Sequence, residues 1–255
     1  MIRYILIILI LFSCGNNENI TKKQIAKSKD TIIEIKKIVI SKKKIKIDKN
    51  LVLGKFNYKK DSNFIKVSSK HSPKSIYLNK EVYLYFIKMF DAAKKENIEL
   101  KILSGTRNFN HQKSIWERKW NKYKSLEPIK RAKKILEFSS MPTTSRHHWG
   151  TDLDLNNFNN SYFEKGKGLK EYNWLVKNAN NYGFYQVYTS KKNGRTGYNL
   201  EKWHWSYLPL ASEYLKFYNE NITYKDITGF KGSELAKEAR MIEDYVNGIN
   251  IEIKN

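Results

Sequence analysis

Alternation of apolar and polar residues marks the strands of this chain, and apolar spacings of three and four mark its helices. Residues 151–155 and 203–207 alternate strictly, so each predicts a strand with one polar and one apolar face. Weaker alternation predicts two more strands, at residues 98–103 and 184–188. Helical spacing is found at residues 80–93, 115–123, 128–138, 172–182, 210–219 and 233–247.

The order of these elements indicates the fold class. Strands and helices are mixed without the regular strand–helix–strand repeat that builds a parallel sheet. We therefore predict an α+β fold with a small antiparallel sheet and flanking helices. The compact domain is expected over residues 51–225, and residues 226–255 are expected to form a C-terminal helical extension.

The first residues have the pattern of a secretory signal. Arg3 precedes an apolar run at residues 4–12, which is too short for a membrane span of about 20 residues. The run leads into Cys14, the only cysteine, in a context that resembles a bacterial lipobox. We expect residues 1–13 to be removed and Cys14 to carry a lipid that holds the protein at a membrane of the cell envelope. The alternative is a cytosolic protein with an incidental cysteine.

Basic residues give the chain a net charge of +23, and lysine is concentrated near the N-terminus. We expect residues 14–50 to form a lysine-rich tether, although part of this segment could add a strand to the domain. Such a segment can lie on anionic lipid or polyanionic glycan, and a general bias of the sequence towards Lys, Asn and Ile explains it as well. Nucleic acid is the usual partner of a basic protein. Export argues against that partner, and a monomer is expected.

Two clusters hold histidines with carboxylates close in the sequence. One contains His147 and His148 followed by two aspartates, and the other contains Glu201 and His204. A catalytic zinc takes three ligands of these types and needs a further carboxylate as proton acceptor. Because residues three apart face opposite sides of a strand, Glu201 must lie in the loop before the strand, or at a bulge, to reach a metal at His204. A hydrogen-bonded surface cluster is the alternative. The other histidines, His71 and His111, are expected on the surface.

Three motifs occur in a fixed order within residues 80–210. They are Ser104-Gly105-Thr106-Arg107 with Gln112, then Ser145-x-His147 with Asp154, then Glu201-x-Trp203-His204. In sequence and order they resemble the VanY-type D-alanyl-D-alanine carboxypeptidases and their relatives, the D-Ala-D-Ala dipeptidases and L,D-carboxypeptidases. The resemblance implies the fold of the hedgehog and D,D-peptidase group, with a zinc site at the sheet.

The resemblance also implies a role for each motif residue. One zinc ion per chain would be bound by His147, Asp154 and His204. Glu201 would be the catalytic base, and Arg107 would stabilise the oxyanion of the tetrahedral intermediate. Ser104, Gln112 and Ser145 would contact the substrate.

The sequence departs from the family pattern at Asp152, where the family has a small residue. On an alternating strand Asp152 shares a face with Asp154, so it could orient a ligand or replace one. His148 is likewise an alternative to His147.

The function implied by the resemblance is hydrolysis of the C-terminal D-Ala, or D-Ala-D-Ala, peptide bond of peptidoglycan stem peptides. An L,D-carboxypeptidase, a dipeptidase or an endopeptidase would use the same chemistry on another bond. A wall-binding lipoprotein that has lost catalysis is the alternative of another class. The presence of all four catalytic positions counts against it.

Overall fold

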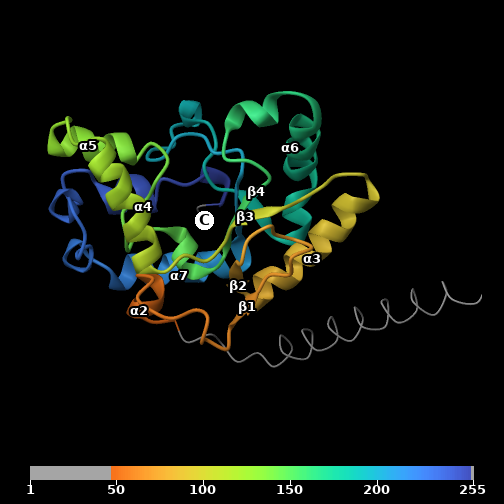
Figure 1. The fold of residues 1–255 in the computed structure, drawn as a ribbon, viewed down its shortest axis with the longest axis horizontal. Helices are drawn as coiled ribbons and strands as arrows, with labels where there is room; N and C mark the ends of the chain where they lie inside the picture. The colour runs from red at the N-terminus through yellow and green to blue at the C-terminus, as the bar shows by residue number, and fades with distance from the viewer. Residues whose placement is uncertain (1–46, 254–255) are drawn as a thin grey trace, which may run out of the picture. The chain divides into compact units, whose positions relative to one another are not determined.

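A four-stranded antiparallel sheet lies at the centre of the computed structural model, which describes residues 47–253 (Figure 1). Its strands run in the order β3-β4-β6-β5. Their bounds are β3 (Ile102–Ser104), β4 (Asp152–Leu155), β5 (Phe184–Gln186) and β6 (His204–Tyr207). A separate hairpin pairs β1 (Phe64–Lys66) with β2 (Tyr77–Asn79). The predicted α+β class with a small antiparallel sheet is confirmed.

Six α-helices surround the sheet in the described part of the chain. They are α2 (Lys49–Val52), α3 (Lys80–Lys95), α4 (Phe109–Lys122), α5 (Pro128–Ile135), α6 (Gly166–Asn178) and α7 (Leu208–Asn221). Asn79 caps α3 by accepting a hydrogen bond from the backbone N–H of Glu81, as its position before the helical pattern predicts. No helix within residues 47–253 has the length and apolar character that crossing a bilayer requires.

The two faces of the sheet differ as the alternation predicts. Leu153 and Leu155 of β4 and Trp205 of β6 are buried in a core shared with α3 and α6. The opposite face carries acidic and histidine side chains, because Asp154 pairs directly with His204 across the two strands. In Figure 1, α3 and α6 lie on one side of the sheet and α4 and α5 on the other. A polar face therefore looks towards α4.

A second core joins α4 and α5 to the C-terminal residues. Trp116 of α4 is fully buried there, and its indole N–H donates to the carbonyl of Lys231 at 2.8 Å. The helix expected at residues 233–247 is wrong. Instead, a 3-10 turn (Ser233–Leu235) and a π-helical turn (Met241–Val246) are separated by residues 236–240, the last of which, Arg240, has a left-handed φ of 55°. A left-handed residue cannot continue a right-handed helix.

Other predicted elements are present with shifted ends. The strand expected at residues 98–103 is reduced to β3, because the backbone N–H of Lys101 donates to the side chain of Asn156 instead of to a neighbouring strand. The expected helix at residues 172–182 begins six residues earlier, at Gly166, and its last turn is a 3-10 turn (Ala179–Tyr182). The signal peptide, Cys14 and most of the tether lie outside the described residues.

Candidate metal centre and active site

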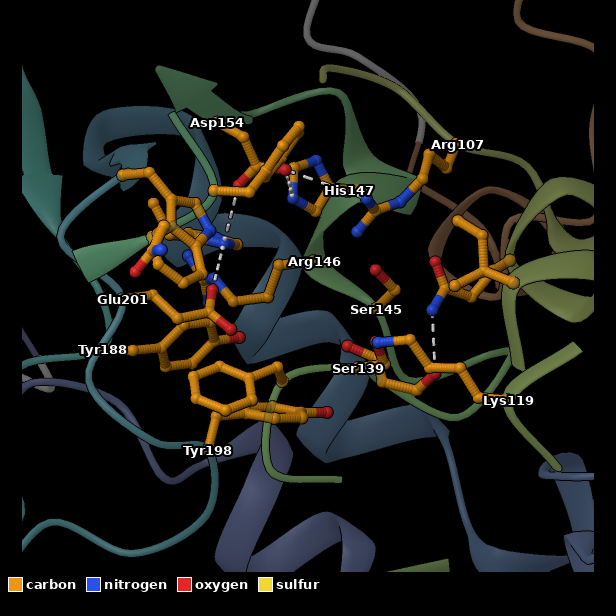
Figure 2. A pocket seen from close by; sticks show the side chains of 18 of the residues that line it. Arg107, Lys119, Ser139, Ser145, Arg146, His147, Asp154, Tyr188, Tyr198 and Glu201 are labelled. Atoms are coloured by element: carbon orange, nitrogen blue, oxygen red, sulfur yellow. Dashed lines mark hydrogen bonds and ion pairs between the residues drawn. The ribbon is translucent and has the colours of Figure 1, made fainter. Parts of the chain in front are cut away.

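A cavity of about 560 Å³ opens between the polar face of the sheet and α4 (Figure 2). The sequence motifs predict part of its lining. Among the lining residues are Arg107, Gln112, Ser145, His147, Asp154, Glu201 and His204. Ser104, expected beside them, lies just outside the lining, and its Oγ accepts a hydrogen bond from Arg107 at 3.1 Å. The fold thus brings motifs about 100 residues apart to one cavity.

Three of the cavity residues form a group able to hold a metal ion. One ligand atom from each of His147, Asp154 and His204 lies within 4.8 Å of the other two. His147 Nε2 is 3.3 Å from Asp154 Oδ2, and His204 Nδ1 is 3.4 Å from Asp154 Oδ1. All three side chains are buried. Their arrangement follows from the sheet, since Asp154 and His204 face each other on β4 and β6.

The hydrogen bonding of His147 leaves one of its two ring nitrogens free for a cation. His147 Nδ1 donates to the carbonyl of Gly105 at 2.8 Å, which directs Nε2 towards Asp154. His147 Nε2 and Asp154 Oδ1 are buried and have no hydrogen-bond partner. Such unpartnered atoms cost free energy that a bound cation would recover. Two imidazoles and one carboxylate with an open position suit zinc, so the residues present fit the metal that the resemblance implies.

Asp152 lies behind His204 and holds its ring in place. Its Oδ2 accepts from His204 Nε2 at 2.8 Å and from Arg146 Nε at 3.0 Å. Its Oδ1 accepts from the hydroxyls of Ser206 and Thr151, both at 2.7 Å. Burial favours the neutral acid, but Arg146 and His204 hold the pKa of Asp152 well below its usual range. Of the two roles left open by the sequence, these contacts favour orientation of a ligand, because the proton on Nε2 leaves Nδ1 to the cation.

His148 has no free ring nitrogen. Its Nδ1 donates to the carbonyl of Arg107 at 2.6 Å, and its Nε2 accepts from the backbone N–H of Thr143 at 3.1 Å. Burial lowers its pKa to about 3, so the ring stays neutral. These bonds favour His147 over His148 as the ligand. They also fix the backbone of Arg107, a contact that no sequence pattern indicated.

Glu201 lies in the loop before β6, a position that its spacing of three residues from His204 allows. Its Oε2 is 3.3 Å from His204 Nδ1, and the side chain is buried. Burial raises the pKa of Glu201 above its ordinary value, with His204 opposing the shift. A carboxylate with a raised pKa beside a metal group is suited to accepting a proton and giving it up again.

Arg107 brings a positive charge to the site. Its Nη1 lies 3.8 Å from Asp154 Oδ2, and the guanidinium lines the cavity. Two polar atoms near it are buried without a partner, Ser145 Oγ and Gln112 Oε1. Gln112 is held by its amide N–H, which donates to the carbonyl of Ser140 at 2.8 Å. The cavity thus offers polar groups to a ligand on the side away from β6.

Several other lining residues were not predicted from the sequence. Tyr188 packs its ring 4.7 Å from that of His204. Trp203, for which the alternation of apolar residues allows either a core position or one beside the cleft, lines the cavity between Phe138 and Phe158. Lys119 and Ser139 complete the wall formed by α4 and the segment after α5. Tyr188, Lys119 and Ser139 belong to no motif, whereas Trp203 stands in the third motif, which gave it no role. The fold brings the four side chains together.

Of the two histidines expected on the surface, one prediction is wrong. His111 is exposed as expected. His71 is buried, with Nδ1 2.7 Å from the hydroxyl of Tyr83 and its ring 4.5 Å from that of Phe90. It occupies a turn between polar residues, so neither helical nor strand periodicity indicates its burial.

Comparisons with known proteins agree with the motifs. The family model described as VanY, D-alanyl-D-alanine carboxypeptidase, matches residues 75–210. The putative carboxypeptidase YodJ of Bacillus subtilis is 32% identical over 134 residues, which are 52% of this chain and 46% of that protein. A D-alanyl-D-alanine carboxypeptidase of Enterococcus faecalis is 28% identical over 144 residues, 56% of this chain and 52% of that protein. The chain spans about half the length of these curated relatives.

A solved structure has a similar fold. The LdcB LD-carboxypeptidase is 26% identical, with a TM-score of 0.50 that covers 67% of this chain and 77% of that one.

Proposed function

Because this chain belongs to the VanY family of D-alanyl-D-alanine carboxypeptidases, we propose that it is a zinc-dependent peptidase of the cell envelope. Its reaction is hydrolysis of the C-terminal D-Ala, or D-Ala-D-Ala, peptide bond of peptidoglycan stem peptides. The observation that carries the proposal is the convergence of His147, Asp154 and His204 on one point, with the buried Glu201 beside them. Zinc, when bound, supplies a Lewis acid that polarises a carbonyl and acidifies water.

The protein side chains divide the remaining work. Glu201 takes the proton of the attacking water and passes it to the leaving amine, which its raised pKa favours. Arg107 donates hydrogen bonds to the oxygen that gains negative charge in the transition state. Ser145 and Gln112 offer free polar atoms for positioning the peptide. Asp152 keeps the His204 ring in the orientation that its role requires.

One substitution separates metal binding from catalysis. Glu201→Gln removes the proton acceptor and retains the shape of the side chain. We expect it to bind zinc at the wild-type stoichiometry and to lose turnover by at least about 100-fold, in line with the contribution of general acid–base catalysis. Persistent hydrolysis by this variant would show that another group is the base.

The bond that is cut separates the two nearest candidate reactions. Similarity to the LdcB LD-carboxypeptidase favours a second candidate, removal of the terminal D-Ala from a tetrapeptide stem. Defined pentapeptide and tetrapeptide stems, digested with the full protein and analysed by mass spectrometry, distinguish the two. Shortening of the pentapeptide alone supports the D,D-carboxypeptidase, and a tripeptide from the tetrapeptide supports the second candidate. No product from either stem, or from a cross-linked dimer, would contradict the proposed peptidase.

The cellular location follows from the N-terminal sequence and the substrate class. We propose export followed by lipid attachment at Cys14, with the lysine-rich segment as a tether. Replacing Cys14 by Ser should move the protein from the membrane fraction to the soluble fraction of the envelope. An unchanged distribution would contradict the anchor and leave the peptidase proposal intact.

A further inference from the structure

The wall of the cavity opposite Glu201 presents a lysine that no motif predicts. Lys119 lies seven residues after Gln112 on α4, two turns along the same face. Its Nζ donates to Ser139 Oγ at 2.6 Å, and both residues line the cavity. Figure 2 shows Lys119 and Ser139 across the cavity from Tyr188 and Glu201.

The charge of Lys119 is not in direct contact with a carboxylate in the described residues. Among the ion pairs of residues 47–253, none involves Lys119, although the side chain is half-buried. Burial lowers its pKa, the carboxylate of Glu201 opposes the shift, and the charges of Arg118 and Arg107 add to it. A cation that is withdrawn from water without a partner costs free energy. An anion that enters the cavity would recover that cost.

The donors at this wall point to the kind of anion. Lys119 uses one of its three N–H donors on Ser139. Because Ser139 Oγ accepts that bond, its own hydroxyl proton remains available. Ser139 is itself buried, so its hydroxyl faces little water other than that of the cavity. A carboxylate, with two acceptor oxygens and a negative charge, matches this set of donors.

We propose that Lys119 and Ser139 form a subsite that binds a carboxylate of the peptide substrate. The proposal rests on the proposed peptidase function and deepens it, because it names the group that the enzyme requires on its substrate. The carboxylate is either the main-chain terminus or an acidic side chain of the terminal residue. In both cases Lys119 is a specificity-determining residue, and the subsite lies in the part of the cavity that the motifs leave undefined.

Binding measurements on an inactive background test the subsite directly. Zinc-loaded full-length Glu201→Gln protein is titrated calorimetrically with D-Ala-D-Ala, with its C-terminal amide, and with D-Ala-D-Glu α-amide. Lys119→Met is then added to this background. We expect at least one free carboxylate to improve binding over the neutral amide by about 10- to 100-fold, the usual worth of a charged hydrogen bond. Lys119→Met should abolish that preference, which is measured as the ratio of the affinities for the free carboxylate and the neutral amide.

The three ligands identify the source of the carboxylate. A preference for D-Ala-D-Ala over its amide assigns the subsite to the peptide terminus, whereas a preference for the D-Glu amide assigns it to a side chain. Lys122→Met, at an exposed position of the same helix, is the matched control and should behave as the parent. Lys119→Arg should retain part of the preference. If Lys119→Met does not fold, Lys119→Gln serves, since it removes the charge and keeps a donor to Ser139.

The subsite and the peptidase function fail in different ways. An unchanged carboxylate preference in folded, zinc-loaded Lys119→Met protein overturns the subsite, even if the wild type hydrolyses stem peptides. Failure of the wild type to hydrolyse any stem, together with Lys119-dependent carboxylate binding, overturns the peptidase function and supports the subsite.

Discussion

At the scale of single residues, the partners of each ring nitrogen decide what three crowded histidines do. His147 gives one nitrogen to a backbone carbonyl and keeps the other for a metal. His204 donates from Nε2 to the carboxylate of Asp152 and keeps Nδ1 for the metal. His148 uses both nitrogens to join two backbone segments. The sequence predicts that histidines matter here, but it cannot reveal tertiary hydrogen bonds, which is why it left His147 and His148 as alternatives.

The contact between Asp152 and His204 has a measurable consequence. Asp152→Asn replaces a strong acceptor by a weaker one at His204 Nε2. We expect zinc affinity to fall by about 10- to 100-fold, as for other groups that orient metal ligands. Competition with a chromophoric chelator measures it, with Asp91→Asn at an exposed position of α3 as the control. Equal zinc affinity in both variants would mean that Asp152 serves packing alone.

His71 makes stability depend on pH away from the active site. Burial lowers its pKa to about 4 from an ordinary value near 6.5, so the unfolded chain binds a proton more readily than the folded one. The contribution of neutral, buried His71 to the free energy of unfolding is therefore complete above pH 6.5 and is lost as the pH falls towards 4. Urea unfolding between pH 7 and pH 4 should show a smaller loss for His71→Gln than for the wild type. If the free energies of unfolding of the two proteins fall in parallel with pH, His71 is not the source of the pH dependence.

At the scale of elements, strict alternation was a reliable guide and helical spacing was less so. Residues 151–155 and 203–207 have the predicted faces, and Glu201 lies in the loop that its offset from His204 allows. The helix expected at residues 233–247 fails at Arg240, whose left-handed backbone divides it into two short turns that contribute to the second core. Helical spacing shows which residues are apolar, but it does not show where a residue such as Arg240 adopts a left-handed conformation and ends the helix.

The turn that carries His147 depends on a glycine. Gly150 ends it with a φ of 71°, and an added Cβ would lie 2.4 Å from the ring of Phe64. Gly150→Ala should destabilise the protein by about 3 kcal/mol, through backbone strain and overpacking together. Gly194→Ala, at a φ of 87° in open space, isolates the strain and should cost about 1 kcal/mol. Equal losses in urea unfolding would contradict a steric constraint at Gly150.

At the scale of the whole molecule, the sequence predicts more of the reaction chemistry than of the specificity. The proposed ligands and the proposed base stand in short motifs, so they can be recognised from the sequence alone. Lys119, Ser139 and the aromatic wall around Trp203 come from separate segments, and only the tertiary structure assembles them. The domain limits and the lipid at Cys14 stay predictions, since they depend on residues 1–46 or on experiments in cells.

The proposed hydrolysis requires one metal ion shared by His147, Asp154 and His204. The zinc content of the full-length protein, determined by mass spectrometry of the metal after removal of loosely bound ions, tests this most directly. We predict one zinc per chain in the wild type and nearly none in His204→Ala. A wild type that retains no zinc, or a His204→Ala variant that keeps a full equivalent, would contradict a zinc site formed by these three residues.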